Sequence, residues 1–165
     1  MQITIHPERT TCKLVTIPIY PHLKKFIFKF YEIPPDSPFI DLERHTGLYV
    51  AMNSCIRSKQ KKRSARDEYT GTERYTEPVT FLLTSKLSRL TLTHAIVIRF
   101  SNEFDKLFKE SFYQWVIAQD NSGLNNSEAI RSFKAHYNII EGEYSFENFR
   151  RLWRRYNEKA RKMKK

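Results

Sequence analysis

The sequence predicts a helix-rich α+β fold, in which a small N-terminal part of strands and helices precedes a C-terminal unit of three helices. Two runs rich in β-branched residues, 11–19 and 78–84, have the composition of β-strands. Many of the other apolar residues recur three or four positions apart, as in amphipathic helices. A hydrophobic fraction of 40% and an aromatic fraction of 14% indicate a folded chain, because disordered basic chains carry few rings.

Proline marks the ends of the first elements in the N-terminal part, residues 1–100. Pro21 follows the first strand and fits the first turn of a helix, since that position needs no amide hydrogen. The apolar residues from 23 to 31 have helical spacing, and the helix must end before Pro34. We therefore expect a strand followed directly by a helix.

Less regular segments come next. Residues 32–46 have the composition of a loop, and 47–56 that of a second short helix. Residues 93–100 fit either a strand or the start of a helix, because periodicity does not decide between the two. A strand followed by helices thus occurs twice, which fits a tandem ribbon-helix-helix arrangement with paired strands; an ordinary small α+β core is the alternative.

Three helices are expected in the C-terminal part, residues 101–165. Ser101 is the expected N-cap of the first helix, which carries a long aromatic face. Asn125 is the expected N-cap of the second, with Glu128 completing a capping box. Ser145 is the expected N-cap of the third, because its hydroxyl can accept an amide hydrogen of the first turn.

The third helix separates its apolar residues from its charges. At 100° per residue, the apolar ones fall within an arc of roughly 120°. The other face is almost wholly cationic, and Glu147 and Glu158 are too few to neutralise it through i,i+4 pairs. We interpret this face as a nucleic-acid surface, because the planar guanidinium group of arginine can form paired hydrogen bonds with phosphates and guanine edges. The alternatives are a membrane- or calmodulin-binding helix and a plain solvated face. The apolar residues are Phe146, Phe149, Leu152, Trp153 and Tyr156.

Three successive helices, the last being the most basic, resemble helix-turn-helix DNA-binding domains, in which the final helix enters the major groove. The resemblance covers residues 102–165, although the connector 138–144 exceeds the usual turn. It implies that arginines of the last helix contact bases or phosphates, that Asn148 reads adenine, and that Lys134 and His136 lie near the DNA backbone. The expected binding residues of the last helix are Asn148, Arg150, Arg151, Arg154, Arg155, Lys159, Arg161 and Lys162.

A second basic segment lies in the loop expected over residues 57–77. Residues 57–66 contain six cations and no acid. Such a run serves either as a solubilising linker or as an arm that becomes ordered on phosphates. The cations of this run that we expect to bind nucleic acid are Arg57, Lys59, Lys61, Lys62, Arg63 and Arg66.

Composition and motifs narrow the function classes. The net charge of +11 predicts attraction to polyanions. Cys12 and Cys55 stand alone, so we expect two buried, reduced thiols and neither a disulfide nor a metal site. No secretory signal or long apolar run appears, which predicts a cytoplasmic, nucleoid-associated protein without a membrane partner. Walker, nucleophile-elbow and His-Glu-x-x-His motifs do not occur, and we expect neither an enzyme nor a cofactor.

The sequence therefore predicts a non-enzymatic nucleic-acid-binding protein. We expect duplex DNA rather than RNA as its partner and a role as transcription regulator or accessory factor, of a kind frequent in phages and mobile elements. RNA binding would predict exposed rings on a sheet face. A symmetric DNA site would need a homodimer, for which no heptad is visible. The alternative is a protein-interaction or structural module whose basic helix docks on an acidic partner.

Overall fold

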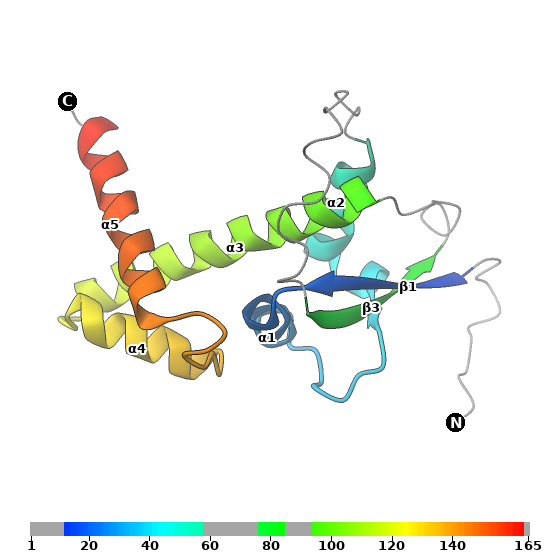
Figure 1. Cartoon of the computed structure of the whole chain (residues 1–165), viewed down its shortest axis with the longest axis horizontal. Coiled ribbons are helices and arrows are strands. Elements are labelled where there is room, and N and C mark those ends of the chain that lie inside the picture. The colour runs from blue at the N-terminus through cyan, green and yellow to red at the C-terminus, as the bar shows by residue number, and fades with distance from the viewer. Residues whose placement is uncertain (1–11, 58–75, 85–93, 164–165) are drawn as a thin grey trace.

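The computed structural model describes residues 12–57, 76–84 and 94–163, which form a helix-rich α+β fold (Figure 1). None of the described helices combines the length and the apolarity needed to cross a bilayer. In chain order the elements are β1 (Cys12–Ile19), α1 (Pro21–Phe30), β2 (Ile40–Asp41), the 3-10 helix η1 (Leu42–Arg44), α2 (Thr46–Arg57), β3 (Glu77–Thr84), α3 (His94–Asn121), α4 (Asn126–His136) and α5 (Phe146–Met163).

The small sheet has the strand order β1-β3-β2. β1 pairs antiparallel with β3, and β2 pairs parallel with the other edge of β3. Because side chains alternate along a strand, one face of the sheet is buried. The buried side chains on this face are Ile17, Ile19, Val79, Phe81 and Leu83.

The pairing of β1 with β3 is the one that a tandem ribbon-helix-helix chain would need. However, α1 has 10 residues and α3 has 28, so the two halves are not matched copies.

The first helices follow the expected pattern, whereas the segment between them does not. α1 begins at Pro21 and buries Leu23, Phe26 and Ile27, as its spacing predicted. The loop expected over 32–46 contains β2 and η1. A two-residue strand gives no periodic signal, which is why the sequence did not indicate it.

α3 begins earlier than expected. The ambiguous residues before 101 form its first two turns, and Ser101 is a buried residue inside the helix rather than its N-cap. The boundary that we placed between residues 100 and 101 therefore falls inside α3, which runs along the molecule from the sheet to α4 and α5 (Figure 1).

A continuous apolar stripe explains the length of α3. The stripe is buried along its whole length, and its members recur every four residues. At 100° per residue, each step of four turns the stripe by about 40° around the helix. Its first half therefore faces the sheet, where Phe100 meets Phe81 with ring centroids 5.3 Å apart, and its second half faces α4 and α5. The stripe comprises Ile96, Phe100, Phe104, Phe108, Phe112 and Val116.

Candidate nucleic-acid interface

The start of α5 is fixed by two acceptors for its first amide groups. Ser145 is the N-cap, as predicted: its Oγ accepts a hydrogen bond from the Asn148 amide at 3.2 Å. Glu141 Oε1 accepts one from the Phe146 amide at 2.8 Å. A hydrogen bond from Lys134 and that from Phe146 lower the pKa of Glu141. A negative charge is thus held at the positive end of the helix, where it is stabilising.

α5 packs through its aromatic face, as the sequence predicted. Phe149 is fully buried, with ring centroids 4.9 Å from Phe112 and 5.7 Å from Phe133. Trp153 and Tyr156 are half-buried and stack on each other at 5.4 Å. Burial of rings such as Phe149 contributes about 1.5–3 kcal/mol each. The rings therefore fix which side of α5 faces the solvent.

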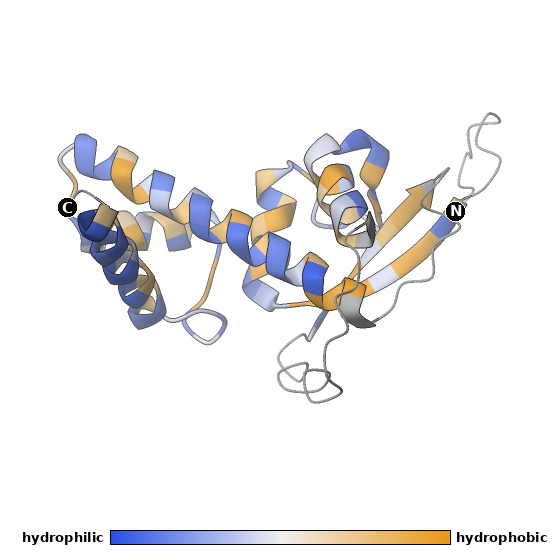
Figure 2. Cartoon of the chain, turned by 90° about the horizontal axis from the view of Figure 1, so that it is seen from above, coloured by the Kyte–Doolittle hydropathy of each residue, from blue (hydrophilic) through white to orange (hydrophobic). Residues whose placement is uncertain are grey.

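The solvent side of α5 is strongly cationic. The helix carries seven arginines and lysines but only two acids, a net of five positive charges, and Figure 2 shows it as the most hydrophilic helix of the fold. Glu147 lies 3.2 Å from Arg150 and 3.6 Å from Arg151, and Glu158 lies 3.9 Å from Arg154. Exposed ion pairs of this kind contribute about 0–1 kcal/mol to stability. A phosphate can therefore replace the glutamates as the partner of these arginines.

Four of these arginines line a groove of about 590 Å³ between α5 and the first turn of α4. Asn126 and Ser127 form the α4 side of this groove. The amide of Asn125 and the amide of Glu128 are already used by the capping box of α4, which is present as predicted. From α5 the groove is lined by Glu147, Arg150, Arg151, Trp153, Arg154, Asn157, Glu158 and Arg161.

The structure brings together one of the two predicted groups of binding residues. All the candidates on α5, from Asn148 to Lys162, lie on one exposed helix. Arg57 is the last residue of α2. The rest of the basic run, Lys59 to Arg66, lies outside the described residues.

The expectations for Lys134 and Cys12 need correction. Lys134 does not face outward toward a DNA backbone: its ammonium pairs with Glu141, and its side chain is only 13% exposed. This ion pair fixes the connector that precedes α5.

Cys12 is exposed, whereas burial was expected for both thiols. Cys55 is buried, and burial raises the pKa of its thiol. The β1 edge position leaves Cys12 uncovered by the described part of the chain.

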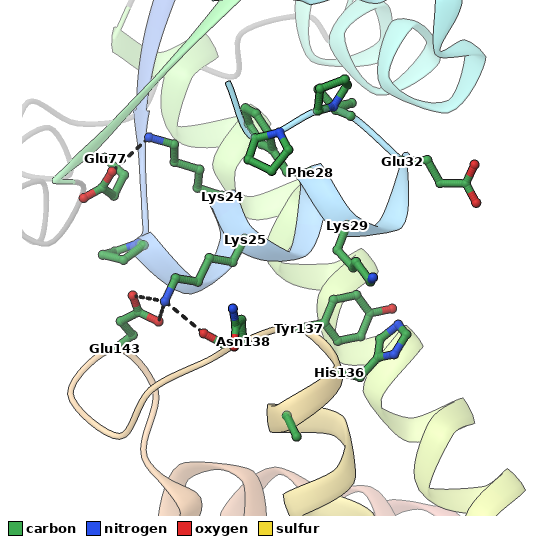
Figure 3. A pocket seen from close by; sticks show the side chains of 15 residues that line it. Lys24, Lys25, Phe28, Lys29, Glu32, Glu77, His136, Tyr137, Asn138 and Glu143 are labelled. Carbon is green, nitrogen blue, oxygen red and sulfur yellow. Dashed lines mark hydrogen bonds and ion pairs between the residues drawn. The ribbon is translucent and has the colours of Figure 1, made fainter. Parts of the chain in front are cut away.

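A second anchor of the connector, here called the connector clamp, consists of Lys25, Asn138 and Glu143 (Figure 3). Lys25 Nζ donates to the Asn138 carbonyl oxygen at 2.9 Å and lies 2.7 Å from Glu143 Oε1. Glu143 Oε2 also accepts from the Ile140 amide at 3.2 Å. The clamp ties α1 to the segment that sets the direction of α5. No sequence pattern indicated it, because Lys25 lies more than 110 positions before its partners.

No cluster of three or more His, Cys, Asp or Glu residues that could hold a metal ion occurs among the residues described. Comparison with models of protein families, with curated proteins and with solved structures finds no match to this chain.

Proposed function

We propose that this protein binds nucleic acid through the exposed face of α5, with duplex DNA as the preferred partner. One observation carries the proposal: α5 turns its rings toward the rest of the protein, with Phe149 fully buried, and keeps seven cations exposed, with two acids beside them. Phosphate contacts supply most of the affinity of such surfaces for DNA, because they release counterions. A role as a regulator or accessory factor at the nucleoid would follow from that activity.

The order of the helices supports duplex DNA. α3, α4 and α5 succeed each other as in helix-turn-helix domains, whose last helix enters the major groove. Arg150, Arg151 and Arg154 are exposed by 59–69% and have the reach and the fork geometry for guanine edges. Lys159 and Lys162 project near the end of the helix, where contacts with phosphates give affinity without sequence information.

The proposal is tested by salt-titrated binding to a fluorescent random duplex. Four to five phosphate contacts predict a slope of about −4 in a plot of log affinity against log salt. A variant with Arg150, Arg151, Arg154 and Arg155 changed to alanine should lose binding at 100 mM salt, with an unchanged circular dichroism spectrum.

The matched control removes four cations outside α5 and therefore has the same net charge as the quadruple α5 variant. It should bind within about threefold of the wild type, because electrostatic attraction depends on where the charges lie. Equal losses in both variants would mean that only the net charge matters, and no affinity of the wild type even at low salt would favour an acidic protein partner. The control changes are Lys13, Lys29, Arg44 and Lys106 to alanine.

A further inference from the structure

A second, larger cavity lies away from α5. It has a volume of about 1070 Å³ and lies between α1 with the loop after it and the end of α4 (Figure 3). No residue of α5 lines it. Its volume is slightly above the range of about 300–1,000 Å³ that is usual for sites that bind small molecules. We call it the α1 cleft.

Most of the charges of the α1 cleft are already paired. Lys24 pairs with Glu77 at 3.0 Å, and Lys25 belongs to the connector clamp. Within the described part of the chain, Lys29 and Glu32 form no ion pair. Figure 3 shows the Glu32 carboxylate directed away from the other labelled side chains, whereas Lys29 points toward the side of the cleft that carries Tyr137 and His136. The unpaired charge that points toward the cleft is therefore the positive charge of Lys29, an exposed residue at its edge.

The rings of His136 and Tyr137 line the same cleft as Lys29. A tyrosine hydroxyl is protonated at neutral pH and can donate a hydrogen bond, and burial raises the pKa of Tyr137 further. The His136 ring packs on Trp115 with centroids 4.9 Å apart and on Tyr137 at 4.7 Å. This packing holds the two polar rings in fixed positions, so that an anion would meet donors that are already in place.

The opposite part of the lining is apolar. Phe28 lies on α1, and Ile33, Pro34 and Pro35 follow it in the loop after the helix. Proline and aromatic surfaces offer contact area without polar groups that need partners. A ligand that fits this lining has an apolar body and one negative group.

We propose that the α1 cleft binds a small organic anion, a carboxylate or a phosphate monoester on an aromatic or aliphatic body. The anionic group contacts Lys29 and the Tyr137 hydroxyl, and the body lies against Phe28, Ile33 and Pro34. This site is separate from the nucleic-acid surface and does not depend on it.

The test uses the 165-residue chain with benzoate and phenyl phosphate as probes. In a ¹⁵N-labelled sample, both should shift the amide signals of Lys29, Glu32 and Tyr137 saturably. Trp115 gives a second signal through its contact with His136, once Trp153→Phe has removed the other tryptophan. Shifts that never saturate, or that occur over the whole surface, would overturn the proposal.

Matched probes and variants separate charge from shape. Benzyl alcohol, which has the same ring without the charge, should bind at least tenfold more weakly than benzoate, and inorganic phosphate more weakly than phenyl phosphate. Lys29→Gln should raise the Kd for benzoate about tenfold or more, because a charge-assisted contact is lost. Lys106→Gln, on exposed α3 surface, should not change it. An unchanged Kd in Lys29→Gln, or equal binding of benzoate and benzyl alcohol, would refute the assigned ligand class.

Discussion

The stability of this fold should depend on the protonation of His22, a buried residue in the first turn of α1. His22 is 4% exposed, and neither ring nitrogen has a hydrogen-bond partner among the described residues. Its ring lies within 5.5 Å of three aromatic rings, those of Tyr20, Phe108 and Tyr144. Burial and, secondarily, the positive charge of Lys109 lower the pKa of His22 from 6.5 to about 4.

The sign of the effect follows from proton linkage. The unfolded chain binds a proton at His22 near pH 6.5, and the folded chain does so only near pH 4. The unfolded state therefore takes up more protons between these values, so the folded state loses stability as the pH falls from 6.5 toward 4. The full shift corresponds to about 3 kcal/mol, of which about 2 kcal/mol is lost by pH 5.

The experiment compares the wild type with His22→Phe, which keeps a ring among the aromatic neighbours and cannot be protonated. Urea unfolding at pH 7.5 and pH 5 gives the free energy of unfolding of each protein. The variant should gain about 2 kcal/mol relative to the wild type between the two pH values. Other titrating groups cancel in this difference. An equal pH dependence in both proteins, or an imidazole NMR signal of folded His22 that titrates near 6.5, would refute the reasoning.

Three further predictions concern packing, capping and the clamp. Phe112→Ala should lower the free energy of unfolding by about 3–5 kcal/mol, because it opens a cavity between α3, α4 and α5; a decrease of less than about 1 kcal/mol in urea unfolding would contradict this. Asn125→Ala should cost about 1 kcal/mol through loss of the capping box, and Asn125→Ser should restore much of it. Lys25→Met should lower the free energy of unfolding by about 1 kcal/mol. It should also weaken DNA binding several-fold, although Lys25 lies outside α5. An unaltered DNA affinity would show that the clamp does not control the direction of α5.

Local signals in the sequence predicted local structure. The caps at Asn125 and Ser145 form the expected hydrogen bonds, because a cap needs only its own first turn. Pro21 likewise begins α1 where expected. The amphipathic pattern of α5 predicted which face would be buried, since the rings and the cations separate at one helical period.

One error concerned a local signal, and the other features that the sequence did not indicate depend on distant contacts. Ser101 has the chemistry of an N-cap, but the apolar spacing of four residues continues upstream of it through Phe100 and Ile96. This spacing was visible in the sequence and outweighs the cap signal. β2 depends on β3, its neighbour across the sheet. The connector clamp and the α1 cleft join segments more than 100 positions apart, and a single sequence gives no indication of such pairs.

The apolar stripe turns gradually around α3. The number of residues in this helix therefore determines how the sheet at one end is oriented relative to α4 and α5 at the other. One residue inserted between Phe104 and Phe108 would rotate everything downstream by about 100° relative to the sheet. Phe108 would leave its contacts with α1, and Glu143 would swing out of reach of Lys25. Single-residue insertions or deletions in α3 should therefore be tolerated far less well than substitutions on its exposed side.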